Sequence, residues 1–279
     1  MLAYQHAYHA GNFADVHKHL LLVTLRDRLL RKESAITYID THAGRGHYPL
    51  HAEEARKLQE HREGVEPIWR ARSAASGALK AWLAQLAEAQ PGNDLTHYPG
   101  SPRWLSAGLR AQDRLSLFEL HPGEFGHLER ADEDARVRRV HGDGLAGLKR
   151  LLPVATPRLC VLIDPSYELK EEYRDLVATL AWVGRKARHA VVAVWYPLLP
   201  AGRHQELLEG LKNTGLRKVW RSEVRLREPG AERHGMYGSG MLVLNPPWGL
   251  DQAVEEAMSQ VTAIWGAPAR HRADWWLPE

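Results

Sequence analysis

The chain has 279 residues, of which 44% are hydrophobic and 25% charged. These proportions are typical of a soluble globular protein and exclude an intrinsically disordered chain. Its 37 Lys and Arg residues against 34 Asp and Glu leave a net charge of +3, which is compatible with a nucleic-acid partner but does not require one. The only cysteine, Cys160, excludes an intrachain disulfide and a multi-cysteine zinc site, and we expect it to be buried as a small hydrophobe.

Residues 1–19 contain four histidines and no apolar segment of the kind found in a signal peptide. No apolar run in the sequence is long enough to span a bilayer. We therefore expect a cytoplasmic protein without membrane contact, and a monomer. The histidines at 6, 9, 17 and 19 lack a matching carboxylate or cysteine pattern, so we predict that no metal is bound.

Residues 12–31 are predicted to form a largely buried helix. Asn12 and Asp15 take the N-cap and N3 positions of a motif that resembles a capping box, with Asp in place of the usual Glu. Lys18 falls within the first two turns, where a cation works against the helix dipole. It is therefore either an ordinary surface lysine or a cation held for a carboxylate or phosphate.

A short β-rich run, residues 35–39, ends in Asp40 and opens into the loop Gly44-Arg45-Gly46. A glycine loop that follows a strand lets the backbone come close to a nucleotide-type ligand. The third glycine of the dinucleotide-binding fingerprint is missing, since Pro49 stands in its place. This argues against an NAD-dependent enzyme.

Residues 50–96 are predicted to be a small helical insertion. A charged helix over 53–72 is followed by a helix over 78–90, whose apolar residues Leu79, Trp82, Leu83 and Leu86 recur at helical spacing. The remaining α/β domain would comprise residues 1–49 and 97–279. Whether the insertion helps to bind substrate or is a lid or stabilising appendage stays open.

Six further strands are predicted, at 114–119, 137–141, 158–164, 189–195, 218–225 and 241–244, with helices at 205–213 and 251–264 among those that accompany them. Together with the strand at 35–39 they predict an α/β fold with a seven-stranded, doubly wound, Rossmann-like sheet. Ligands of such a sheet bind beyond the carboxyl ends of its strands. Four acids stand at or just past such ends and are expected to converge there: Asp40, Glu119, Asp143 and Asp164.

These acids are suited to different tasks. Glu119 is placed to accept hydrogen bonds from ribose hydroxyls, and Asp143, between two glycines, could hold an adenine amino group. Asp164, which Pro165 follows, would alone suggest a turn-starting cap, but the company of the other acids favours a reaction centre. No Gly-x-Ser-x-Gly motif, Walker lysine or Cys-His pair accompanies them.

Taken together, the motifs resemble the S-adenosylmethionine-dependent N6-adenine methyltransferases, and among them the RlmJ family of bacterial 23S ribosomal RNA adenine-N6 methyltransferases. Each motif alone is weak, whereas the combination is specific and runs nearly the whole length. The motifs are Met1-Leu2-x-Tyr4-x-His6-x-x-His9-Ala10-Gly11-Asn12, Asp40-Thr-His-Ala-Gly-x-Gly-x-Tyr48, Tyr98-Pro-Gly-Ser-Pro102, Glu119-Leu-His-Pro122, Asp164-Pro-x-Tyr167, Gly240-Met241 and Asn245-Pro-Pro-Trp248. The resemblance implies a class I methyltransferase sheet whose last strand is antiparallel.

The resemblance also implies a cofactor, a partner and roles for individual residues. The cofactor would be S-adenosyl-L-methionine and the partner 23S ribosomal RNA, which Tyr4 would contact. Asp164 would be the proton acceptor, the Pro165 carbonyl would bind the adenine amino group, and Tyr167 would stack on the base unless it is only a packed loop aromatic. Cofactor contacts would fall on Lys18 or His19, His42, Ser101, Glu119, Asp143, Gly144 and Asp164.

In two places the sequence departs from a simple match. Ser166 stands where the family signature has a second proline, and we expect activity to survive because the acid, the first proline and the aromatic remain. The stretch from Asn245 to Trp248 matches the general signature better, but an antiparallel strand would turn Asn245 away from the cofactor. Trp195 could help to frame the base, although we favour core packing for it.

Two other functions remain open from the sequence alone. A DNA adenine-N6 methyltransferase would share the same reaction centre, and a catalytically silent RNA-binding relative would be compatible with Ser166. The family has also been connected with the use of external DNA as a nutrient, which is a phenotype and not a reaction.

Overall fold

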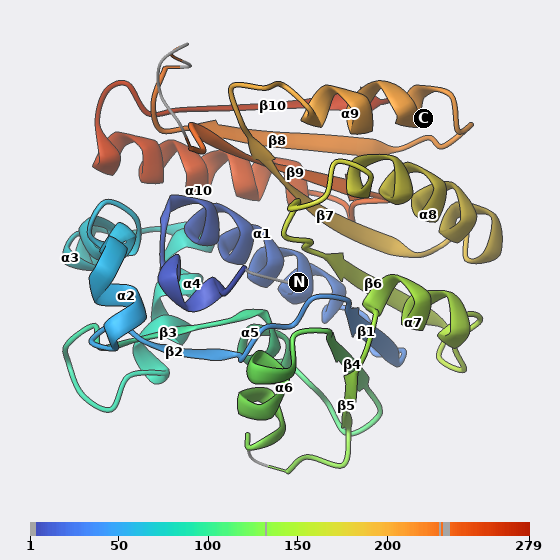
Figure 1. Cartoon of the computed structure of the whole chain (residues 1–279), viewed down its shortest axis with the longest axis horizontal. Helices are drawn as coiled ribbons and strands as arrows, with labels where there is room; N and C mark the ends of the chain where they lie inside the picture. The colour runs from blue at the N-terminus through green and yellow to red at the C-terminus, as the bar shows by residue number, and fades with distance from the viewer. Residues whose placement is uncertain (1–3, 132, 229, 231–234) are drawn as a thin grey trace.

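The computed structural model of the protein describes residues 4–131, 133–228, 230 and 235–279. Met1 and Leu2, which open the N-terminal motif, lie outside these residues. The centre of the molecule is an eight-stranded sheet with the strand order β10-β8-β9-β7-β6-β1-β4-β5 (Figure 1). Its strands are β1 (Ile36–Asp40), β4 (Arg114–Glu119), β5 (Val137–His141), β6 (Arg158–Ile163), β7 (Val191–Leu198), β8 (Val219–Arg225), β9 (Gly238–Leu244) and β10 (Arg270–Leu277).

The sheet is mostly parallel. Strands β7, β6, β1, β4 and β5 pair in parallel, whereas β9 runs antiparallel between β7 and β8. The predicted α/β, Rossmann-like fold is therefore confirmed. Consecutive strands of this kind are joined by helices that cover both faces of the sheet.

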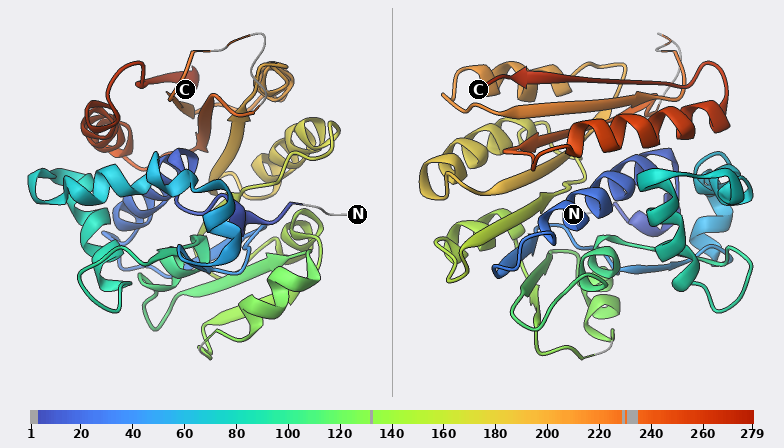
Figure 2. Two further views of the ribbon diagram at one scale, coloured as in Figure 1. Left: turned by 60° about the vertical axis from the view of Figure 1, so that its left-hand side comes forward. Right: turned by 180° about the vertical axis from the view of Figure 1, so that it is seen from behind.

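Helices lie on both sides of the sheet (Figure 2). One face is packed by α1 (Phe13–Leu29), α5 (Ser101–Ser106) and α10 (Leu250–Trp265). The other is packed by α7 (Gly144–Leu151), α8 (Glu172–Lys186) and α9 (His204–Lys212). Helix α6 (Pro122–Glu129) follows β4. None of the helices in the described residues combines the length and the apolar character that a membrane span needs.

The predicted number of seven strands was wrong, because β10 forms an eighth at the edge. Its sequence, Arg-His-Arg-Ala-Asp-Trp-Trp-Leu, lacks a clean alternation of apolar and polar residues. The strand is held instead by antiparallel pairing with β8 and by Arg221, whose guanidinium donates to both carboxylate oxygens of Asp274 at 2.8 Å. The final helix is thus followed by a strand that depends on its contacts with β8 and that its own sequence does not predict.

The segment predicted as an insertion begins and ends at a small two-stranded sheet. Strands β2 (His47–Pro49) and β3 (His97–Pro99) pair antiparallel, with Tyr48 opposite Tyr98. Between them lie α2 (Glu53–Leu58), α3 (Val65–Arg70) and α4 (Gly77–Glu88). Short 3-10 turns at 60–62 and 72–74 separate these helices, and another at 6–8 precedes α1.

A continuous helix over 53–72 was a wrong prediction. Helix α2 ends at Leu58, and the next residue, Gln59, takes a left-handed φ of +53°. The chain then turns back onto the N-terminal segment: the Val65 N–H donates to the Gly11 carbonyl at 2.9 Å, and a Cβ on Gly64 would lie 2.3 Å from that same oxygen. Glycine is therefore required for this close approach, which no helical periodicity reveals.

Candidate active site

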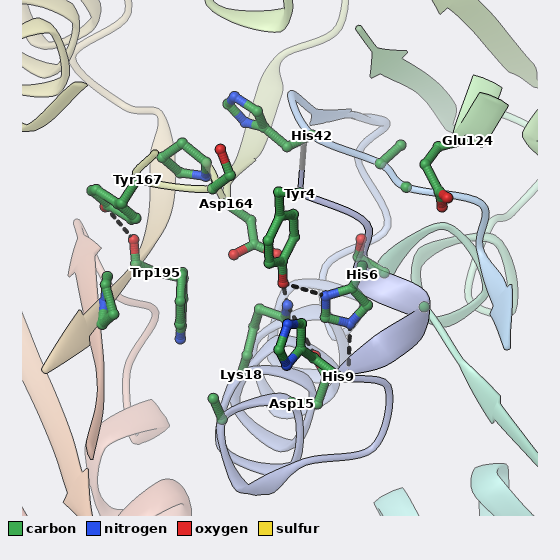
Figure 3. A pocket seen from close by; sticks show the side chains of 18 of the residues that line it. Tyr4, His6, His9, Asp15, Lys18, His42, Glu124, Asp164, Tyr167 and Trp195 are labelled. Carbon is green, nitrogen blue, oxygen red and sulfur yellow. Dashed lines mark hydrogen bonds and ion pairs between the residues drawn. The ribbon is translucent and has the colours of Figure 1, made fainter. Parts of the chain in front are cut away.

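Asp164 lies just beyond β6, at the edge of a cavity of about 330 Å³. The cavity opens at the carboxyl ends of β1, β4, β6 and β7, where a doubly wound sheet binds its ligands. Helix α1 and the N-terminal segment close it from the other side (Figure 3). The cavity therefore has the position that the strand-end acids predicted.

Lys18 is a cation held for carboxylates, the second of the two predicted alternatives. Its Nζ lies 2.6 Å from Asp164 Oδ2 and 3.1 Å from Asp15 Oδ1, and its side chain is buried. Burial alone would lower the pKa of Lys18, but the charges of Asp164 and Asp15 outweigh it and raise the pKa. The lysine thus carries its charge at the floor of the cavity.

The N-terminal segment brings Tyr4 over this ion pair. The Tyr4 hydroxyl lies 2.9 Å from His6 Nδ1, and His6 Nε2 lies 2.9 Å from Asp15 Oδ2. The Tyr4 ring also stacks on the His9 ring, with centroids 5.6 Å apart. Burial would raise the pKa of Asp15, but His6 and Lys18 hold it well below its usual value. Figure 3 shows Tyr4 beside Asp164. Its contact with a substrate stays a prediction.

The four N-terminal histidines each make a hydrogen bond, and His6 and His19 both lie within 3.9 Å of Asp15. His9 Nδ1 lies 3.0 Å from Glu60 Oε2, His19 Nδ1 lies 3.0 Å from the Tyr98 hydroxyl, and His17 contacts two serines. In the part of the chain that the structure describes, no three or more His, Cys, Asp or Glu side chains are grouped as metal ligands. His19 lines the cavity from below while almost fully buried.

Glu119 ties the glycine loop to the end of β4. Its Oε2 accepts the Gly44 N–H at 2.8 Å and its Oε1 accepts the His121 N–H at 2.6 Å. Gly44 has a left-handed φ of +60°, and a Cβ there would lie 2.3 Å from the Tyr48 hydroxyl. A carboxylate has about four lone-pair sites, so Glu119 can still accept hydrogen bonds from a ligand. Burial raises the pKa of this group.

Arg45, between the two loop glycines, holds the glycine loop to α6 by a contact that was not predicted. Its guanidinium makes a two-pronged contact with Glu124 of α6, with distances of 3.0 and 2.6 Å. Such paired contacts fix geometry as well as charge. An arginine inside a Gly-x-Gly loop was the available signal, but its partner lies 79 residues away in the sequence.

His42 and Ser101 line the cavity as predicted, whereas Asp40 does not. Burial lowers the pKa of His42 to about 4, so its ring is neutral at pH 7. Asp40 is fully buried and accepts the His42 N–H at 3.2 Å. Burial, assisted by the charge of Asp164, raises the pKa of Asp40 to about 7. Asp40 therefore supports the crevice from beneath.

Asp143 and Gly144 stand at the same edge of the sheet but are not among the described residues that line the cavity. Asp143 caps α7, since its Oδ1 accepts the N–H groups of Leu145 at 2.8 Å and Ala146 at 3.1 Å. A Cβ on Gly144 would lie 1.9 Å from the Thr41 carbonyl oxygen, so only glycine fits there. Their contact with a cofactor stays a prediction.

The loop after Asp164 is fastened to β7. Tyr167 has a left-handed φ of +55°, and its hydroxyl donates to the Trp195 carbonyl at 2.5 Å. Its ring packs on Tyr173 with centroids 4.5 Å apart. Pro165, Ser166 and Tyr167 all line the cavity. Tyr167 is thus a packed aromatic on one side, and its stacking on a base stays a prediction.

The competing Asn-Pro-Pro-Trp stretch lies on the side of the sheet where the parallel strands begin, opposite to the cavity. Because β9 runs antiparallel to β7, Asn245 sits beside the start of β7. Its amide donates to the carbonyls of Arg188 and Ala190, both at 2.9 Å, and Trp248 is 86% exposed. The predicted antiparallel strand and the predicted placement of Asn245 are both confirmed.

Comparison with known proteins gives consistent results. The model of a family described as "Ribosomal RNA large subunit methyltransferase D, RlmJ" matches residues 33–277. The chain is 36% identical, over 259 residues and 92% of each chain, to the Ribosomal RNA large subunit methyltransferase J of Escherichia coli K12. The protein of the same name from Haemophilus influenzae is 35% identical over 263 residues, which are 94% of this chain and 93% of that one.

A solved structure matches the whole fold. The crystal structure of protein LPL1258 from Legionella pneumophila has a TM-score of 0.89 and 31% sequence identity to this chain. The superposition covers 96% of this chain and 98% of that one. The arrangement of the sheet and its helices is therefore shared along nearly the full length of both.

Proposed function

Because the chain belongs to the RlmJ family of large-subunit ribosomal RNA methyltransferases, we propose that it methylates N6 of an adenine in 23S ribosomal RNA, with Asp164 as proton acceptor. The observation that carries this proposal is the position of Asp164. It stands at the edge of the cavity with Pro165 and Tyr167 next to it, and a buried lysine fixes one of its oxygens.

The residues present fit the cofactor S-adenosyl-L-methionine. Gly44 lines the cavity, and Glu119 keeps acceptor sites for hydroxyl groups after it binds the Gly44 and His121 N–H groups. When bound, the cofactor supplies an electrophilic methyl group carried on a sulfonium. We propose that the residues that hold it are Lys18 or His19, His42, Ser101, Glu119, Asp143, Gly144 and Asp164.

The chain's own part in the chemistry follows from Asp164 and Pro165. An exocyclic adenine nitrogen is a weak nucleophile because its lone pair is delocalised into the ring. Lys18 engages Oδ2 of Asp164, so Oδ1 can accept one N–H of that nitrogen while the Pro165 carbonyl accepts the other. The nitrogen is thereby drawn towards tetrahedral geometry, and Asp164 takes the proton that it loses on methylation.

Alignment should provide much of the rate enhancement. Tyr4 above the ion pair and Tyr167 beside it are the groups that we propose to meet the substrate, whose base must leave its stack to reach Asp164. We further propose that the protein acts as a monomer in the cytoplasm, through a methyltransferase domain of residues 1–49 and 97–279 and an insertion of residues 50–96.

The decisive experiment is to incubate the protein with cofactor labelled in its methyl group and with either unmodified 23S ribosomal RNA or double-stranded DNA. We expect label in N6-methyladenosine from the RNA, identified by mass spectrometry of the nucleosides. Label in DNA alone would establish the DNA methyltransferase instead. Binding of cofactor and RNA without methyl transfer to RNA or to DNA would establish a catalytically silent relative.

A further inference from the structure

The strand order divides the cavity into two sides at Asp164. β6, which leads to Asp164, lies between β1 on one side and β7 on the other. The glycine loop after β1 and Glu119 at the end of β4 are on the first side, and Trp195 of β7 is on the second. In Figure 3, Trp195 and Tyr167 lie to one side of Asp164, and Glu124 lies to the other.

Trp195 belongs to the side that is left for the acceptor. The proposed cofactor contacts at the glycine loop and Glu119 take up the first side, and methyl transfer requires the donor and the acceptor to approach each other across the reaction centre. Trp195 lines the cavity and is half-buried. An aromatic ring at such a position can pack against the face of a flipped base.

A chain of hydrogen bonds leads from the indole of Trp195 into the core. Trp195 Nε1 donates to Ser239 Oγ at 3.0 Å, and Ser239 Oγ lies 3.0 Å from His17 Nδ1. His17 Nε2 lies 2.9 Å from Ser222 Oγ, which lies 2.7 Å from His271 Nε2. His17 and both serines are fully buried, so no water competes for these contacts.

One set of bond directions satisfies every contact in this chain. An indole N–H only donates, so Ser239 accepts it and its own proton is available for His17 Nδ1. His17 then carries its proton on Nε2 and donates it to Ser222, whose hydroxyl proton goes to His271 Nε2. In this arrangement each of these four contacts joins one donor to one acceptor.

Both histidines are neutral at pH 7, as this pattern requires. Burial holds the pKa of His17 well below its usual value, and burial lowers the pKa of His271 to about 4. A neutral imidazole has one donor and one acceptor nitrogen, which is what its place in the chain demands. A protonated His17 would offer two donors and could not accept from Ser239.

Helix α1 therefore presents two neighbouring residues to the site in different ways. Lys18 fixes Asp164 directly, and the preceding His17 holds Trp195 through Ser239. An unbonded imidazole in this leucine-rich helix would cost free energy, since burial of a polar group without a partner is unfavourable. The chain of bonds satisfies it and ends at a wall of the cavity.

We propose that Trp195 forms a wall for the acceptor adenine and that His17 is a positioning residue that sets the orientation of this wall through Ser239. The inference rests on the proposed function, because an adenine must be the acceptor. It changes the interpretation of Trp195 from core packing to a substrate contact.

The hydrogen-bonded chain can be tested without substrate. In protein with ¹⁵N-labelled tryptophan, the indole signal of Trp195 is assigned by its absence from Trp195→Phe. We expect this signal to shift in Ser239→Ala and His17→Leu, and to stay near its wild-type position in His17→Gln, whose amide can both accept and donate. The matched control is Thr179→Val, which removes a buried hydroxyl of α8 on the other face of the sheet.

Steady-state kinetics with RNA then tests the role in substrate binding. Ser239→Ala and His17→Leu should each raise the KM for RNA about tenfold, the equivalent of one hydrogen bond, and leave the KM for the cofactor unchanged. His17→Gln should restore the wild-type KM, and Trp195→Phe should make a further Ser239→Ala change without effect.

The outcomes separate this inference from the proposed function. An indole signal that does not respond to Ser239→Ala overturns the hydrogen-bonded chain. If Ser239→Ala and His17→Leu methylate RNA with an unchanged KM for RNA, or if the KM rises equally for RNA and cofactor, the role of His17 and Trp195 is overturned. The proposed function is unaffected by that result. A wild-type protein that methylates no RNA overturns the proposed function, and the adenine wall with it.

Discussion

Two stretches of this protein carry nearly the same short signature, and they lie beyond opposite ends of the strands of one sheet. Asp164-Pro165-Ser166-Tyr167 follows the parallel strand β6, and Asn245-Pro246-Pro247-Trp248 follows the antiparallel strand β9. Each contains a residue with left-handed φ, +55° at Tyr167 and +50° at Asn245. Both are therefore sharp, proline-stiffened turns at the end of a buried strand.

The difference between them lies in what faces the first residue of the signature. Asp164 meets a buried lysine and a cavity, whereas the Asn245 amide is used up by two backbone carbonyls. The better match to the sequence pattern is thus the stretch that does not line the cavity of Asp164. Strand direction, which no short motif contains, decides which of the two turns can meet a ligand.

The largest expected effect comes from exchanging the acid at one turn and the amide at the other. Asp164→Asn should lower kcat for RNA methylation by about 10³-fold, because an amide cannot take the proton from the adenine amine. Asn245→Ala should leave kcat unchanged, since Asn245 lies at the far edge of the sheet. The measurement is label transfer to RNA, with thermal unfolding as the control for folding. The reverse pattern would show that the wrong turn has been assigned to catalysis.

A second large effect should follow from removal of the buried lysine that pairs with Asp164. Lys18→Met should destabilise the protein by about 3 kcal/mol, because it leaves Asp15 and Asp164 without their buried partner. Urea unfolding measures this loss. The double variant Lys18→Met with Asp164→Asn should lose less than the sum of the two single changes. Strict additivity would mean that the ion pair makes no contribution of its own.

The two ends of β9 give a third, smaller test. Ser239 near its start contacts His17, whereas Asn245 follows its end. Burial lowers the pKa of His17 in the folded state, so the stability that depends on its neutral form is complete above its ordinary pKa of about 6.5 and is lost as the pH falls below it. Between pH 7.5 and pH 5 wild type should lose about 2 kcal/mol more than His17→Gln, measured by urea unfolding. Equal losses would show that His17 is not held neutral.

The smallest effect should come from making the two signatures alike. Ser166→Pro restores the second proline, stiffens the turn and removes one N–H. Because the acid, the first proline and the aromatic are already present, kcat should change by no more than about threefold. Methyl transfer that is seen only after this substitution would contradict our expectation that the natural turn is active.

Local signals made much of the fold predictable. The N-cap was correct, since Asn12 Oδ1 accepts the Asp15 N–H at 2.9 Å. The order of strands from residue 114 to residue 244 was correct as well, and the strands β6, β7 and β9 each contain a compact run of apolar residues. Asp164 and Glu119 line one cavity because parallel strands have their carboxyl ends on the same side of the sheet. Burial of Cys160 was confirmed too.

The remaining features depend on contacts between distant parts of the chain. The bonds of His17 reach residues 205 and 222 positions away, and the contact of Arg45 with Glu124 spans 79 positions. The break between α2 and α3 depends on where the Gly11 carbonyl lies. No local propensity contains such information. The strand that contains Trp195 has no acid at its carboxyl end, so there was no reason from the sequence to place Trp195 in a site and not in the core.

The turn between α2 and α3 also has a consequence for how the chain can be altered. Glu60 of this turn accepts from the Asn12 amide and contacts His9, the residue on which Tyr4 stacks. Val65 bonds to the Gly11 carbonyl at the same place. The helical segment of residues 50–96 thus holds the residues that precede α1 in place. A shortened or transplanted version of the protein would have to keep the two segments as a matched pair, since neither is a self-contained module.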